Sequence, residues 1–154
     1  MVIKEVGIMV RGYPLVYSNY HDIGENKIEI ILRSGLLSGI LSFVESAFSN
    51  QSIEYIESKN FIIAFKADKI KAFKSIEEEP IISYAILDKE KKIDNFISKN
   101  VIPILKKILK KFISLYNNRN LTNISQFDDF KEQLNNVFEI ESKSIEDKFK
   151  GLIS

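Results

Sequence analysis

The segment PIISYAIL, residues 80–87, is the stretch on which the fold depends. It is almost continuously apolar, which is typical of a strand covered on both faces at the centre of a sheet. Upstream, residues 53–57 and 61–66 are two β-rich runs separated by a short polar turn, and they predict a hairpin. The charged residues 67–79 are expected to connect this hairpin to the central strand.

The chain opens with another predicted hairpin. Residues 5–10 are rich in β-branched side chains, the sequence Gly12-Tyr13-Pro14 supplies turn chemistry, and residues 15–20 resume an extended pattern. From about Lys27 to Phe48 the apolar period becomes that of a long amphipathic helix.

The second half of the chain has a helical pattern. Asp88 is the expected N-cap of a helix that runs to about Tyr116, and Pro103 should kink or divide it near Asn100. After a loop at residues 117–120, Ser125 resembles the N-cap of a further helix. Its apolar positions are Phe127, Phe130, Leu134 and Val137, and a last short helix is expected over residues 144–152.

The resulting order is β-β-α-β-β-β-α-α, which predicts an α+β fold with a five-stranded, mostly antiparallel sheet and helices on both faces. One face should hold the first helix, and the other face the second helix with its successor. No repeat or low-complexity linker divides the chain. We therefore expect a single domain over residues 1–154, with a core at 1–118 and a helical segment at 119–154.

Composition excludes several kinds of chemistry. The 154 residues include no cysteine and one histidine, His21, so thiolate nucleophiles, thiolate zinc sites and histidine pairs cannot form. Glu77, Glu78 and Glu79 lack a nucleophile partner or calcium-loop spacing and are expected in an exposed loop, while the glycines fit no phosphate-binding motif. We expect no enzymatic activity, no metal site and no cofactor.

Charge and hydropathy bear on partners and location. With 22 basic and 21 acidic residues the net charge is only +1, which argues against a nucleic-acid binder. The first residues carry charges where a signal peptide needs an apolar run, and no segment approaches the ~18 apolar residues of a membrane span. A cytoplasmic location is expected.

Three parts of the sequence resemble the longin domain, a member of the profilin-like, SNARE-like superfamily that also contains roadblock domains. Residues 7–16 are similar to the family's first hairpin, and residues 34–43 resemble the Leu-rich middle of its first helix, where small residues are frequent. The hairpin of residues 53–65, the strand of 81–87 and the helix that follows occur in the family's order. The resemblance covers residues 1–118, and it favours longin over roadblock because no helix precedes the first hairpin.

A stand-alone domain is expected, and the resemblance implies that it binds proteins: a small Ras-like GTPase, another longin or roadblock subunit in trafficking-type regulation, or a second copy of itself as a homodimer. The first helix carries the candidate partner-binding residues Ser34, Gly35, Ser38, Gly39 and Ser42. Glycine costs up to about 1 kcal/mol relative to alanine inside a helix, so a close approach is expected there. That approach is made either by a partner or by the domain's own sheet.

A cluster of lysines marks the second helix. Lys106, Lys107, Lys110 and Lys111 lie in residues 89–119, where nine basic and two acidic residues give a net charge of +7, against −3 on each flank. Like charges four residues apart do not stabilise a helix. These lysines are candidates for contact with an anionic surface, including peripheral membrane contact. The alternative is a solvated face opposite the acidic C-terminal helix.

Three other functions stay open. Because profilin-like folds resemble sensor domains, a small-molecule sensing module is the main alternative, and it predicts an apolar pocket between the sheet and the second helix. A catalytic domain would need His21 in a cleft beside a serine and a carboxylate. An RNA-stacking sheet is conceivable from the interleaved aromatic and basic residues of 61–74.

Overall fold

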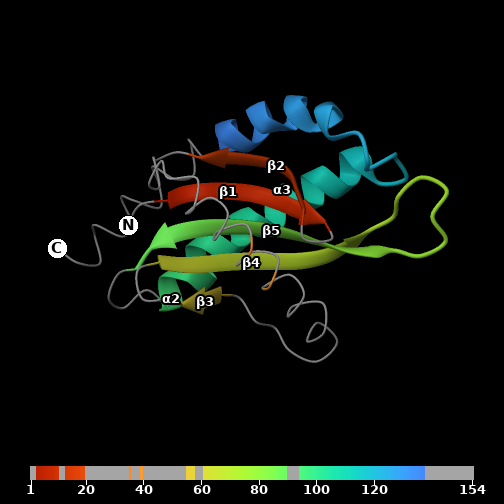
Figure 1. Cartoon of the computed structure of the whole chain (residues 1–154). Coiled ribbons are helices and arrows are strands. Elements are labelled where there is room, and N and C mark those ends of the chain that lie inside the picture. The colour runs from red at the N-terminus through yellow and green to blue at the C-terminus, as the bar shows by residue number, and fades with distance from the viewer. Residues whose placement is uncertain are drawn as a thin grey trace.

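β5 (Glu79–Asp88) lies at the centre of a five-stranded sheet in the computed structural model, which describes residues 3–10, 13–19, 35, 39, 55–57, 61–89 and 94–137. Its neighbours are β1 (Ile3–Val10) and β4 (Phe61–Ile70), and the edge strands are β2 (Tyr13–Asn19) and β3 (Tyr55–Glu57). The order β2-β1-β5-β4-β3 is antiparallel at every pairing (Figure 1). The predicted α+β class, the five-stranded sheet and the central strand are therefore confirmed.

Alternation along the three inner strands divides their side chains between two buried layers. One layer continues into the helices of the second half of the chain and includes Val6, Ile8, Ile62, Ala64, Ala85 and Leu87. The layer on the opposite face consists of Met9, Ile63, Phe65, Ile82, Tyr84 and Ile86. Because β5 contributes apolar residues to both layers, its sequence shows a continuous apolar run instead of an alternating pattern.

The second helix is divided just before Pro103, as expected. A short helix α2 (Asp94–Phe96) leads into a π-helical turn η1 (Ile97–Val101), and α3 (Ile102–Tyr116) begins with the proline in its first turn. Proline has no N–H to donate to the preceding turn and its ring needs room there, so a wider turn precedes it. The amide of Asn100 helps to close this turn by donating to the carbonyl of Phe96 at 3.2 Å.

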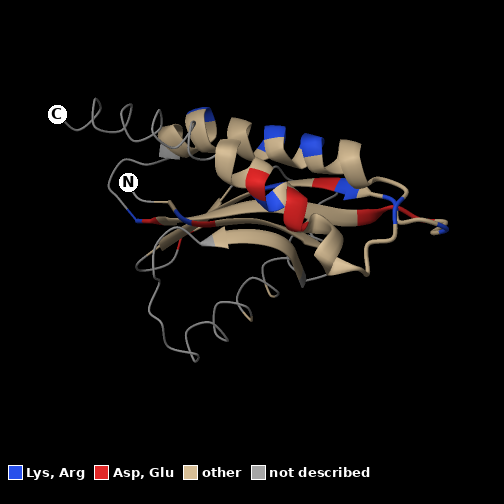
Figure 2. Cartoon of the chain, turned by 90° about the horizontal axis from the view of Figure 1, so that it is seen from above, with Lys and Arg blue, Asp and Glu red and all other residues tan. Residues whose placement is uncertain are grey.

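A 3-10 turn η2 (Ile124–Phe127) and a helix at residues 128–137 follow α3. Phe127, Phe130 and Leu134 are fully buried, and Val137 packs against the same core, which confirms the predicted apolar positions. The ring of Phe112 lies 5.2 Å from that of Phe127 and 5.1 Å from that of Phe130. These contacts hold the last described helix beside α3 on one side of the sheet (Figures 1 and 2).

The hairpin between β4 and β5 is longer than predicted. β4 continues to Ile70, and β5 begins at Glu79, which pairs with Ile70, so only the middle of residues 67–79 forms a loop. The end of β4 was not predicted because this stretch carries charged side chains. Charged side chains fit here because the two strands extend beyond the rest of the sheet and have little core to cover (Figure 1). Pro80 fits β5 because β1 pairs with β5 only from Ile81 onward.

Three local predictions were wrong. Asp88 is not an N-cap but the last residue of β5, where it pairs with Lys4 at 3.0 Å. Ser125 lies inside the 3-10 turn and donates to the side chain of Asn123, the residue that precedes the turn. Tyr13 and Pro14 belong to β2 instead of a turn, since a bulge in the β1 pairing lets an edge strand accept the proline.

Several predictions fall on residues that the structure does not describe. The expected first helix, from about Lys27 to Phe48, is described only at Gly35 and Gly39, both of which are helical. The predicted short helix at 144–152 lies outside the described residues. Within the described ranges, no helix has the length and apolar character needed to cross a membrane.

Candidate functional site

Gly35 and Gly39 are the two described members of the predicted partner-binding set, and Ser34, Ser38 and Ser42 lie outside the described residues. Both glycines are helical and exposed. A Cβ atom built on either glycine would have no neighbour within 4 Å. The alternative explanation, that these glycines allow tight packing of the helix on its own sheet, is therefore not supported at these two positions.

The four candidate lysines of α3, Lys106, Lys107, Lys110 and Lys111, are all exposed. They lie opposite the buried stripe of the helix, which includes Leu105, Ile108, Leu109 and Phe112. Lys106, Lys110 and Lys111 form no ion pair within the described part of the chain, including its acidic residues at 128–137. The alternative of a solvated face opposite the acidic C-terminal helix stays open, because four acidic residues of that segment, Glu139, Glu141, Glu146 and Asp147, lie outside the described residues.

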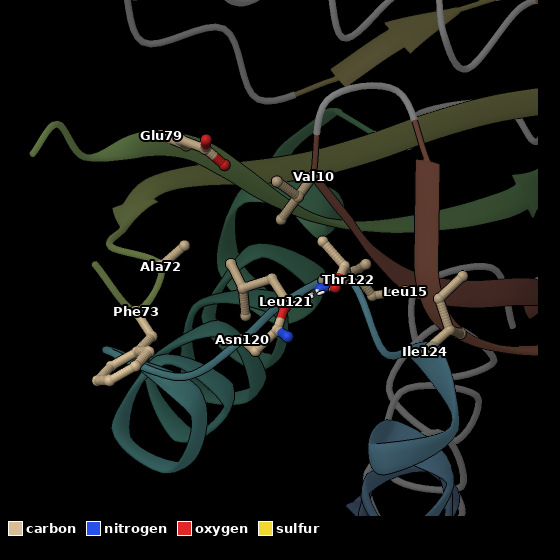
Figure 3. Close-up of a pocket in the computed structure, with 9 residues that line it drawn as sticks. All are labelled: Val10, Leu15, Ala72, Phe73, Glu79, Asn120, Leu121, Thr122 and Ile124. Atoms are coloured by element: carbon tan, nitrogen blue, oxygen red, sulfur yellow. Dashed lines mark hydrogen bonds between the residues drawn. The ribbon is translucent and has the colours of Figure 1, made fainter. Parts of the chain in front are cut away.

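A pocket of about 340 Å³ lies at the end of the sheet from which the β4–β5 hairpin projects (Figure 3). β1 and β2 supply Val10 and Leu15, and the start of the hairpin loop supplies Ala72 and Phe73. The segment that follows α3 closes the other side with Asn120, Leu121, Thr122 and Ile124. The volume is at the lower end of the range for small-molecule sites.

Backbone hydrogen bonds between the hairpin and the segment after α3 hold this pocket in shape. The N–H of Asn118 donates to the carbonyl of Lys71 at 2.7 Å, and the N–H of Phe73 donates to that of Arg119 at 3.0 Å. Asn118 has a φ of 62°, a left-handed conformation that asparagine accepts more readily than most residues. The side chain of Asn120 accepts from both the N–H and the hydroxyl of Thr122.

The pocket differs from the one expected of a sensing module. That function predicted a pocket between the sheet and the second helix, but the described interface between them is filled by buried residues of the sheet and α3. The observed pocket instead lies at the sheet's end, and Phe73 and Ile124 at its edge are more than half exposed. Glu79 is the only charged residue among its described lining residues.

A polar pair inside the second buried layer was missed by the sequence analysis. The hydroxyl of Tyr84 donates to Oε2 of Glu5 at 2.8 Å, and both residues are almost fully buried. Gly7, which pairs with Tyr84 across the strands, makes room for the ring: a Cβ at Gly7 would lie 2.6 Å from the tyrosine oxygen. The only sequence signal was a glutamate two residues before a glycine in an apolar strand.

The other residues considered for chemistry do not form a described site. His21 lies outside the described residues. Glu77 and Glu78 are exposed, but Glu79 is half-buried in β5 and not part of an exposed loop as predicted. No three His, Asp or Glu side chains come together as a metal site within the part of the chain that the structure describes. Comparison with protein-family models and with curated proteins gives no match.

Proposed function

We propose that the chain is a longin-like protein-interaction domain that binds a small Ras-like GTPase, or another longin or roadblock subunit, through its first helix and the adjoining sheet edge. The observation that carries the proposal is the exposure of Gly35 and Gly39 on a helix, four residues apart. Each glycine weakens the helix, and neither is needed to avoid a described neighbour. A partner that packs closely on this helix would account for them.

Two further observations agree with this proposal. Two strands precede the helical residues Gly35 and Gly39, three strands follow them, and α2, η1 and α3 come after these, which is the chain order on which the resemblance rests. β2 is the longer of the two edge strands and carries Tyr17, whose side chain is 47% exposed. An edge strand offers unpaired backbone groups to a partner, and tyrosine is enriched at protein interfaces.

The test is size-exclusion chromatography with light scattering. The chain is measured alone and with small Ras-like GTPases loaded with GDP or with a non-hydrolysable GTP analogue. We expect either a homodimer or a complex that depends on the nucleotide. The double variant Gly35→Arg, Gly39→Arg should abolish the assembly and keep the fold, because each new side chain would point into open space.

The matched control carries the same added charge at exposed helical positions elsewhere, as Ser114→Arg, Asn136→Arg. It should assemble like the unchanged chain. If the chain stays monomeric and binds none of the GTPases in either nucleotide state, the proposal is left without support. Loss of assembly in the control, with the glycine variant intact, would place the interface on the second-half helices instead.

A further inference from the structure

The strongest concentration of one charge in the described structure is on α3. Between Ile102 and Tyr116 this helix has four lysines and no acidic residue. All four lysine side chains are exposed, and Lys99 in η1 is exposed as well. Figure 2 shows the lysine-bearing turns of α3 at the outside of the molecule, with no acidic residue on that helix. The four lysines of α3 are called the lysine face below.

The lysine face points away from the domain core. At 100° per residue, the four lysines spread over about 140° of the helix circumference, centred opposite the buried stripe. Along the axis they occupy only about 7.5 Å. Lys106, Lys110 and Lys111 form no ion pair within the described ranges. Four positive charges therefore lie close together on a short stretch of the helix surface, and three of them are not neutralised by an ion pair within the described ranges.

The residue types on this face favour a lipid surface over a protein surface. Protein interfaces have an apolar, well-packed centre and are depleted in lysine, whereas arginine and aromatic residues are enriched. The lysine face contains no arginine, and its exposed helical neighbours include Pro103 and Ser114 in place of an aromatic centre. A bilayer with anionic headgroups needs no matching shape, because mobile lipids gather around the ammonium groups.

We propose that the lysine face of α3 docks the domain on the surface of a bilayer that contains anionic phospholipid. The attraction is electrostatic and peripheral, and α3 lies along the headgroups with its buried stripe still facing the sheet. This surface is separate from Gly35 and Gly39, so the inference does not depend on the proposed protein partner. Membrane docking and partner binding are tested with different variants and can fail independently.

The experiment is co-sedimentation of the full chain with vesicles. Vesicles of phosphatidylcholine alone are compared with vesicles that contain about 30 mol % phosphatidylserine, a lipid of the anionic class that attracts basic segments. We expect binding only to the second kind, and loss of binding as salt rises from about 0.05 to about 0.5 M, because the screening length shortens several-fold. Each lysine removed should lower partitioning about five-fold, so the Lys→Gln variant at all four positions should lose at least two orders of magnitude.

The control removes the same charge elsewhere. Lys66, Lys69, Lys71 and Lys74 belong to β4 and the loop after it, and their replacement by glutamine also lowers the net charge by four. This variant should lose clearly less binding than the α3 variant, since none of these four lysines lies on α3. Thermal unfolding followed by circular dichroism checks that both variants are folded.

Three results would overturn the proposal. Equal binding to both kinds of vesicle would show that the anionic lipid plays no part. An equal loss in the two variants would show that net charge acts without a defined face. Absence of vesicle binding by the unchanged chain, with lysine-dependent binding to a single-stranded DNA or to an acidic protein, would assign the lysine face to that other class of partner.

Discussion

The two faces of the sheet bury their side chains in different ways. The face under α3 places small residues, Ala64, Ser83 and Ala85, at the middle of the sheet, so that the helix can approach closely. The opposite face carries larger side chains, Phe65 and Tyr84 among them. On the first face, small residues of the sheet make room for the helix. On the second face, a small residue within the sheet, Gly7, makes room for the ring of Tyr84.

The largest predicted effect is in the aromatic cluster that joins α3 to the last described helix. Phe112→Ala should lower the free energy of unfolding by about 3–5 kcal/mol, because the ring is fully buried among three other aromatic rings. Urea unfolding followed by circular dichroism measures it. Leu115→Ala, three residues along and 40% exposed, is the matched control and should cost less than about 1 kcal/mol. Similar costs for the two variants would contradict this packing.

The next effect tests the opposite face. Gly7→Ala should cost about 1–3 kcal/mol, because the new methyl group would overlap the ring and hydroxyl of Tyr84 and displace its hydrogen bond to Glu5. Gly39→Ala, at an open helical position, should instead stabilise the chain by up to about 1 kcal/mol.

A double-mutant cycle shows whether the Gly7 effect acts through Tyr84. Tyr84→Phe removes the atom nearest to the added methyl group, so the double variant should cost less than the sum of the two single changes. The same urea measurement serves all three variants. Strict additivity would mean that the alanine perturbs something other than the tyrosine.

A smaller effect is expected at the contact between sheet and helix. The hydroxyl of Ser83 donates to the carbonyl of Leu105 in α3 at 2.8 Å, and the serine is completely buried. Ser83→Ala should lower the unfolding free energy by about 1 kcal/mol, the usual net value of one hydrogen bond. Ser114→Ala on the exposed side of α3 should have no measurable effect. An equal loss of unfolding free energy in that variant would show that the buried hydrogen bond does not cause the effect of Ser83→Ala.

The smallest effect appears at alkaline pH. Burial raises the pKa of Tyr116 above its ordinary 10.0, Asp129 raises it further, and Arg119 opposes the shift. Above about pH 10 the unfolded tyrosine loses its proton before the folded one does, so stability present below that pH is lost as the pH rises. Urea midpoints between about pH 8 and about pH 11 should therefore fall more steeply for the unchanged chain than for Tyr116→Phe. Parallel curves of urea midpoint against pH for the two chains would show that Tyr116 does not cause the alkaline loss of stability.

The parts of the fold that could be predicted are those with many residues of one pattern. The apolar run of residues 80–87 identified the central strand, and the spacing from Phe127 to Val137 identified a buried helix face. The wrong predictions concern turns and the ends of helices and strands, where one or two hydrogen bonds decide the backbone conformation. Asp88 and Ser125 carry side chains that suit an N-cap, but Asp88 is engaged in a salt bridge with the distant Lys4, and Ser125 in a local hydrogen bond within a 3-10 turn.

The candidate sites were predictable to different degrees. The lysine face could be predicted from helical spacing alone, because four lysines opposite an apolar stripe must point outward together. The pocket at the end of the sheet could not be predicted, since Val10, Ala72 and Leu121 come from segments far apart in the chain. Their meeting depends on how far the β4–β5 hairpin extends and on its hydrogen bonds to the segment after α3.

By itself, the sequence determined the fold class, the central strand, the division of the helix before Pro103 and the outward direction of the lysines. Each of these follows from local periodicity or from the covalent geometry of one residue. Only the tertiary structure decided the strand order, the pairing of Tyr84 with Gly7 and the pocket at the sheet's end. Those features depend on distant segments packing together, and their contact distances are not encoded in any single window of the chain.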